Sequence, residues 1–175
     1  MTLFPSTCSN SFIIGGTDWV NPSSGTVEDG NSARETSSIS NYLYCSGYGF
    51  SLPVNATVIG IMASFKKYAD SGKSAIDNSV KLFENASSVG NDKGTSTVNW
   101  VDTGPTWYDY GSSTDTWGVS LTPTDVNASL FGAGLSGQKN AGGVNPFNLD
   151  VEKMTVFYSV PDSINGGTIY NGTIR

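Results

Sequence analysis

The residue types that most often carry out catalysis are scarce in this sequence. The 175 residues include no histidine, so the commonest general base and metal ligand is missing, as is any Ser-His or Cys-His nucleophile pair. Hydrolysis of a glycoside would need two carboxylates placed together. The four glutamates have the sequence surroundings of turn or solvent-facing residues: Glu28, Glu35, Glu84 and Glu152. We therefore expect no enzyme activity, no catalytic residue and no cofactor.

Loop carboxylates and cysteines are the remaining candidates for a metal site. Asp102, Asp109 and Asp115 could offer oxygen ligands to Ca²⁺, but the Asp-x-Asp-x-Asp-Gly pattern of an EF-hand loop is absent. Cys8 and Cys45 stand 37 positions apart, a spacing that matches no zinc motif. We expect two thiols in preference to a disulfide, and we predict no metal site.

The charge balance narrows the choice of partners. The formal net charge is −6, with nine lysines and arginines together, and only Arg34 and Arg175 are arginines. Nothing in this pattern would neutralise a phosphate backbone, so nucleic acid is excluded as a partner. Residues 1–12 lack a basic region followed by a long apolar stretch. We therefore expect no signal peptide, no transmembrane helix and no membrane partner, and we expect synthesis in a cytoplasm.

The composition favours many short strands joined by polar turns. The chain has 21 glycines, 14% charged residues and 11% aromatic residues. We expect about eight to ten strands separated by regular turn signals, which indicates a single all-β antiparallel sandwich or barrel. No segment has the apolar periodicity of a long amphipathic helix.

Two long strands are expected to form the centre of this fold. The first covers residues 54–68, and its inward face is predicted to contain Ile59, Ile61, Ala63 and Phe65. Lys66 and Lys67 should then lead this strand into solvent. The second strand covers residues 149–161, and its inward face is predicted to contain Met154, Val156, Tyr158 and Val160. Val151 has the opposite parity, which indicates a bulge near Glu152-Lys153.

One short helical turn is predicted near residues 122–128. Thr122 is a suitable N-cap, and Pro123 fits the first helical position, where no N–H donor is needed. Asp125 stands three residues after the cap, where its carboxylate can complete a capping box. These residues are predicted to have structural roles, and a catalytic role for Asp125 would need a second carboxylate nearby.

The four tryptophans are the best candidates for a sugar-stacking surface: Trp19, Trp100, Trp107 and Trp117. Trp117 is expected in the core instead, because it alternates with Val119 and Leu121 as in a half-buried strand. Trp107 lies in a loop-rich stretch and is the best candidate for an exposed contact with a partner or a glycan.

An ordered set of motifs extends over about residues 17–160. Its downstream part contains Trp117-Gly118, Leu121-Thr122-Pro123-x-Asp125-Val126-Asn127, Phe131-Gly132-x-Gly134-Leu135 and Met154-Thr155-Val156-Phe157-Tyr158. Its upstream part contains Trp19-x-Asn21-Pro22, Asp29-Gly30, Tyr42-Leu43, Gly47-Tyr48-Gly49-Phe50-x-Leu52-Pro53 and Ile59-Gly60-Ile61. As a set, these motifs resemble a family of phage virion structural proteins found in tails, fibres and heads.

The resemblance implies a jelly-roll-like β-sandwich without catalysis. It further implies a structural component of a bacteriophage virion, made in the host cytoplasm, with other virion proteins as partners. A capsid decoration, cement or head-associated protein is the main hypothesis. A tail- or fibre-associated subunit and a carbohydrate-binding, receptor-binding module are the alternatives. The family usually has an apolar residue at the position of Cys45, which favours a buried thiol there.

Both chain ends fall outside the resemblance. We therefore predict an N-terminal arm at 1–16, a sandwich domain at 17–160 and a C-terminal arm at 161–175. An isolated short strand is not stable in water and gains by joining a sheet edge. Together with Trp107, the predicted partner contacts are Phe4, Phe12, Ile14, Ile169, Tyr170 and Ile174. Such arms would support a homo-oligomer, for example a trimer.

Overall fold

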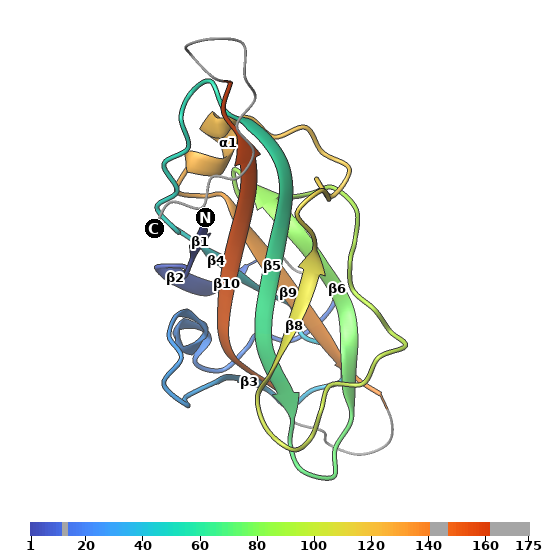
Figure 1. Cartoon of the computed structure of the whole chain (residues 1–175). Coiled ribbons are helices and arrows are strands. Elements are labelled where there is room, and N and C mark those ends of the chain that lie inside the picture. Colours follow the sequence, from blue (N-terminus) through green and yellow to red (C-terminus); the bar gives the residue numbers. More distant parts are fainter. Residues whose placement is uncertain (12–13, 141–146, 162–175) are drawn as a thin grey trace.

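The computed structural model describes residues 1–11, 14–140 and 147–161, which form two antiparallel sheets packed face to face (Figure 1). The predicted all-β sandwich is thus confirmed. The first sheet contains β1 (Thr2–Leu3), β10 (Phe147–Ser159), β5 (Thr57–Ala69), β8 (Thr106–Gly111) and β3 (Ala33–Glu35). The second contains β2 (Thr7–Ser11), β4 (Tyr42–Ser46), β9 (Gly132–Lys139), β6 (Ala75–Glu84) and β7 (Ser87–Val89).

The order of the strands is that of a jelly roll. In the first sheet, β3 pairs with β10, and the order continues through β5 to β8. In the second sheet, the order from β4 is β9, β6 and β7. Between β3 and β10, each strand is followed by a strand of the other sheet, except that β6 and β7 pair within the second sheet, and this is the jelly-roll pattern. Figure 1 shows β10, β5 and β8 side by side in front of β9 and β6.

Residues 1–11 belong to the sandwich, so the prediction of a separate N-terminal arm at 1–16 is wrong for this segment. Strand β1 pairs with β10 through Thr2 opposite Thr155, and β2 pairs with β4 over its whole length. The terminal ammonium of Met1 donates to the Val156 carbonyl at 2.9 Å. These ladders satisfy backbone groups that would otherwise lie at open sheet edges. The predicted C-terminal arm lies outside the described residues from 162 onward.

Two register shifts set which side chains of β5 and β10 point inward. One lies between Leu149 and Val151, slightly before the bulge predicted near Glu152-Lys153. The other lies at the start of β5, opposite the step from Phe157 to Tyr158. This second shift turns Ile59 outward, and the residue is 40% exposed. The prediction that Ile59 shares the inward face of β5 is therefore wrong.

The core between the sheets combines aliphatic and aromatic side chains from both layers. Ile61 and Phe65 of the first sheet and Leu82 and Leu135 of the second are among its fully buried members. Each such burial contributes about 1.5–3 kcal/mol before ordering costs. Edge-to-face aromatic contacts add to this packing. The ring centroids of Trp19 and Trp100 both lie 5.4 Å from that of Phe147.

The two cysteines form a disulfide, contrary to the expectation of two thiols. Cys8 on β2 lies directly opposite Cys45 on β4 in the antiparallel ladder. Residues facing each other in such a ladder have Cβ atoms close enough for their sulfur atoms to bond. Sequence spacing carries no information on strand register, so this pairing was not foreseeable from it. The bond holds the edge strand β2 to its neighbour.

The described chain has two helical turns. The 3-10 turn η1 (Pro22–Thr26) was not predicted and packs against β2 and β10. The turn α1 (Pro123–Asn127) lies at one end of the sandwich (Figure 1). Thr122 is its N-cap, and the Thr122 hydroxyl accepts from the backbone N–H of Asp125 at 3.3 Å. In return, the Asp125 carboxylate accepts from the Thr122 N–H at 2.8 Å, which completes a capping box.

Trp117 is fully buried, but no strand covers residues 117–121. Trp117 and Gly118 both have positive φ angles, 59° and 74°, so the chain reverses direction here. The alternation of apolar residues therefore does not correspond to a strand here. Trp117 is buried because the turn points its side chain into the core. The indole Nε1–H donates to the Ile61 carbonyl at 3.0 Å, which fixes this turn on β5.

The capping box gives a prediction for stability. Thr122→Ala should lower the free energy of unfolding by about 1 kcal/mol, because one backbone N–H of α1 loses its acceptor. Chemical denaturation measures this change. Thr124→Ala is the matched control, since Thr124 is an exposed residue of the same turn. Equal effects of the two substitutions would contradict the capping role.

Candidate functional site

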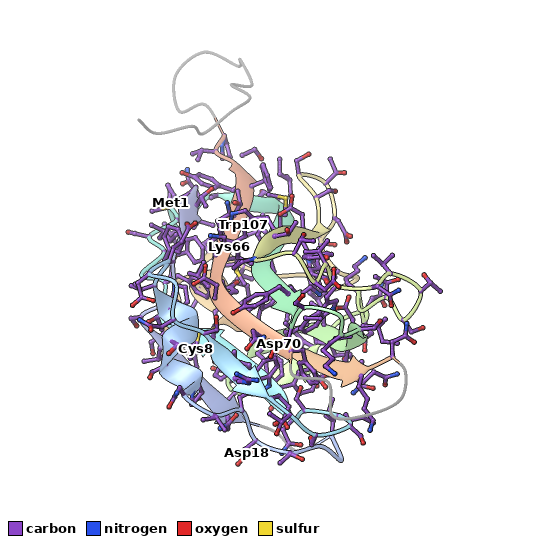
Figure 2. All side chains as sticks on the ribbon, turned by 90° about the horizontal axis from the view of Figure 1, so that it is seen from below. Met1, Cys8, Asp18, Lys66, Asp70 and Trp107 are labelled. Carbon is purple, nitrogen blue, oxygen red and sulfur yellow. A yellow bond between two sulfur atoms is a disulfide. The ribbon has the colours of Figure 1, made fainter. Side chains whose placement is uncertain are left out.

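The tryptophans do not form an exposed row. Trp19, Trp100 and Trp117 are all buried. Trp107 is half-buried on the outer face of the first sheet, where it lies opposite Lys66 in the ladder between β8 and β5 (Figure 2). The Lys153 ammonium lies 3.9 Å from the centre of the Trp107 ring and covers part of its face. A sugar-stacking surface built from several tryptophans is therefore not present.

The predicted partner contacts are spread over different parts of the molecule. Phe4 is 49% exposed and follows β1. Ile14 packs against a small cluster on the second sheet formed by Tyr42, Tyr44 and Phe83. The remaining members of this group lie outside the described residues: Phe12, Ile169, Tyr170 and Ile174.

The three loop carboxylates considered for Ca²⁺ have separate partners. Asp102 accepts from the backbone N–H of Gly72 at 3.1 Å, and Asp109 accepts from the Ser64 hydroxyl at 2.6 Å. Asp115 pairs with Lys93 at 2.7 Å. Across residues 1–11, 14–140 and 147–161, no group of three or more Cys, Asp or Glu side chains is arranged to hold a metal ion.

A cluster of ionisable and hydrogen-bonding side chains lies inside the sandwich, around Lys67 and Asp77. Lys67 projects from β5 and Asp77 from β6, so the pair joins the two sheets. Both side chains are buried. The prediction that Lys67 leads β5 into solvent is therefore wrong. Lys67 has the same parity as Ile61 and Phe65, so its side chain lies on the inward face of β5 as theirs do.

The Asp77 carboxylate accepts hydrogen bonds on both oxygens. Oδ1 accepts from Lys67 Nζ and from the indole Nε1–H of Trp100 at 2.8 Å. Oδ2 accepts from the Tyr110 hydroxyl at 2.7 Å and from the backbone N–H of Thr95 at 3.1 Å. Lys67 Nζ also donates to the Tyr110 hydroxyl oxygen. Lys67, Tyr110 and Asp77 therefore form a closed triangle of hydrogen bonds.

Three aromatic rings surround the ammonium group. Lys67 Nζ lies 4.3 Å from the ring centre of Trp100, 4.7 Å from that of Tyr108 and 4.9 Å from that of Tyr110. Such cation–π contacts partly replace the lost hydration of the charge. Trp100 is held in place because its backbone N–H donates to the carbonyl of Ala75 at the start of β6.

Burial governs the ionisation of this cluster. It lowers the pKa of the Lys67 ammonium to about 8, although the Asp77 carboxylate acts in the opposite direction. Burial also raises the pKa of the Tyr110 hydroxyl, and the charge of Asp77 adds to the rise. Lys67 can therefore lose a proton near neutral pH, whereas Tyr110 keeps its own.

A second buried carboxyl group lies on the inward face of β10. The Tyr48 hydroxyl donates to Glu152 Oε2 at 2.6 Å, and Glu152 Oε1 has no hydrogen-bond partner among the described residues. Burial raises the pKa of Glu152 well above its usual value, with the Tyr48 hydrogen bond acting against this rise. Glu35 is also buried, and its Oε1 accepts from two backbone N–H groups. The prediction that Glu35 and Glu152 face solvent is wrong.

A surface hollow lies beside α1. It has a volume of about 550 Å³ and is lined by residues 56–58, 116 and 118–123. None of these residues has an ionisable side chain. This hollow can accept an apolar or hydroxylated group but offers no acid or base, and the ionisable clusters are enclosed elsewhere.

We found no match between this chain and any family model, curated protein or solved structure. The described helices η1 and α1 each have five residues, too few to cross a membrane. The sequence patterns did not indicate a buried cluster of Lys67, Asp77 and Tyr110, nor a buried carboxyl group at Glu152. Strand parity was the available signal for the lysine, since it continues the apolar face of β5.

The protonation state of the Glu152 carboxyl group gives a second prediction, on how stability depends on pH. Its folded-state pKa is raised, so the folded protein retains a proton that the unfolded chain releases above about pH 4.3. The extra proton bound by the folded state contributes to the free energy of unfolding. This contribution is fully present below that pH and is lost as pH rises toward the folded-state pKa. The loss amounts to about 1.4 kcal/mol for each pH unit.

Glu152→Gln should remove this pH dependence, because glutamine does not ionise. The variant should be more stable than the wild type at pH 7, and its unfolding free energy should change less between pH 5 and pH 7. Urea denaturation across this range measures both effects. Glu84→Gln, at a half-buried carboxylate of β6, is the control and should keep the wild-type slope. An unchanged slope in Glu152→Gln would contradict a buried neutral carboxyl group.

Proposed function

We propose that this chain is a non-catalytic structural subunit of a bacteriophage particle, with a decoration or cement protein on the capsid as the leading role. The observation that carries this proposal is the jelly-roll order of the strands, an architecture common among viral capsid domains and lectins. The ordered sequence motifs that resemble phage virion proteins agree with this fold.

A non-catalytic role is supported by the position of the ionisable groups. Lys67, Asp77 and Glu152 are buried between the sheets, where a substrate has no access. The hollow beside α1 is lined by residues without acids or bases. An enzyme normally concentrates such groups in an accessible pocket.

A carbohydrate-binding role is less well supported. Sugar rings stack on exposed aromatic faces, and three of the four tryptophans contribute to the core instead. Trp107 offers a single ring that Lys153 partly covers. A tail- or fibre-associated subunit remains the alternative within the structural class, because it needs the same kind of assembly surface.

We propose the end of the sandwich near α1 as the assembly surface. Val54 is 91% exposed two positions before Ala56 of the hollow, and Ile59 is exposed directly after Val58 of the hollow. Leu130 is exposed shortly after α1. Ser159, the last residue of β10, pairs with Thr57 of the hollow. Strand β10 therefore ends at this end of the sandwich. Apolar groups here would lose contact with water on binding a neighbouring virion protein or a second copy of this chain.

Association with particles tests this function. The chain should co-purify with phage particles in fixed stoichiometry, and immunogold labelling should place it on the head. Val54→Asp should weaken attachment of the purified protein to particles that lack it, because a carboxylate would be buried at the interface. Val27→Asp is the control, since Val27 is exposed next to η1 and away from the hollow. Labelling of the tail would favour the alternative subunit role, and turnover of a polysaccharide without particle binding would refute the proposal.

A further inference from the structure

The buried pair Lys67 and Asp77 brings an amine and a carboxyl group into direct contact inside a dry core. We propose that these side chains condense into an isopeptide bond, an amide between Lys67 Nζ and Asp77 Cγ, that covalently joins the two sheets. The amine already contacts Oδ1 of the carboxyl group, and both residues lie on strands that hold them there. The inference does not depend on a role in a phage particle.

Tyr110 is placed to relay protons between the reacting groups. Its hydroxyl oxygen accepts from Lys67 Nζ, and its O–H donates to Asp77 Oδ2 at 2.7 Å. A proton can therefore leave Nζ and reach Oδ2 in one concerted shift through the phenol, with Tyr110 restored at the end. Such a positioned acid–base group acts as a general catalyst of proton transfer.

Trp100 is placed to stabilise charge on the other oxygen. When Nζ attacks Cγ, negative charge develops on Oδ1. The indole Nε1–H of Trp100 already donates to Oδ1 at 2.8 Å. A fixed donor of this kind in a water-excluded site lowers the energy of a tetrahedral intermediate.

The reaction balances without any external reagent. The first proton passes from the Lys67 ammonium through Tyr110 to Oδ2, which leaves a neutral amine and a neutral carboxylic acid. The amine attacks Cγ, and the second proton passes from Nζ to Oδ2 by the same route. The Cγ–Oδ2 bond then breaks, and Oδ2 leaves as water with both protons. The product is a neutral amide with one N–H, and the total charge is unchanged.

The core favours the amide over the separate groups. An ion pair in the interior has lost the hydration of both charges, whereas an amide is neutral and needs fewer partners. Hydrolysis would need a water molecule beside Cγ, and the pair is enclosed by three aromatic rings. Burial lowers the pKa of Lys67 to about 8, so a fraction of the amine is neutral and nucleophilic near pH 7.

The intact mass of the full-length protein tests the proposal directly. After reduction of the disulfide, the wild type should be lighter than its sequence mass by one water molecule. Trypsin cleaves after free lysines, so a crosslinked protein should yield one branched peptide that joins residues 67–73 to residues 74–81. A full sequence mass, together with tryptic cleavage after Lys67, would overturn the proposal.

Substitutions test which residues form the isopeptide bond and whether Tyr110 relays the protons. Lys67→Arg should restore the full sequence mass, whereas Lys66→Arg, at the neighbouring lysine, should keep the deficit of one water. Asp77→Asn offers the same carbonyl carbon with a different leaving group, so any deficit there should be one ammonia molecule. Tyr110→Phe should accumulate the uncrosslinked form while folding as judged by circular dichroism. Rapid and complete crosslinking in Tyr110→Phe would refute the relay, and a water deficit in Lys67→Arg would refute the site.

Discussion

The contact between Lys67 and Asp77 is the constraint on which one end of the sandwich depends. A charged pair between two sheets is costly unless every polar atom finds a partner. The surrounding chain meets this demand with donors from Trp100, Tyr110 and the Thr95 backbone. These partners belong to the segment from β7 to β8, whose two strands are the sheet neighbours of β6 and β5 respectively. The pair therefore fixes how this segment folds over the open end of the two sheets.

Alternating hydrophobicity was sufficient to predict the sandwich and the central parts of its long strands. Ile61, Ala63 and Phe65 point inward in β5, as do Met154 and Val156 in β10. The pattern failed where a polar residue occupies an inward position. Lys67 continues the inward face of β5, and Glu152 has the same parity as Met154. Residue type alone assigns both to solvent, because burial of such groups depends on partners that the sequence does not place nearby.

Strand register and local backbone conformation could not be predicted from the sequence either. The pairing of Cys8 with Cys45 depends on the ladder between β2 and β4, which spacing along the chain does not encode. The outward turn of Ile59 depends on one register shift. Trp117 was predicted as buried in a strand, and it is buried in a turn with positive φ. The helical turn at α1 has local signals instead, and its cap, proline and carboxylate occupy the positions that these signals indicate.

Buried polar side chains thus help to hold the two sheets together. Unfolding free energies of Lys67→Met, Asp77→Leu and the double variant test this claim most directly. Each single variant should lose about 3–5 kcal/mol, because it leaves a buried charge or donor set without its partner. The double variant should lose clearly less than the sum, since the two residues act as one unit. Single variants within about 0.5 kcal/mol of the wild type, or losses that simply add, would contradict the central place of this contact.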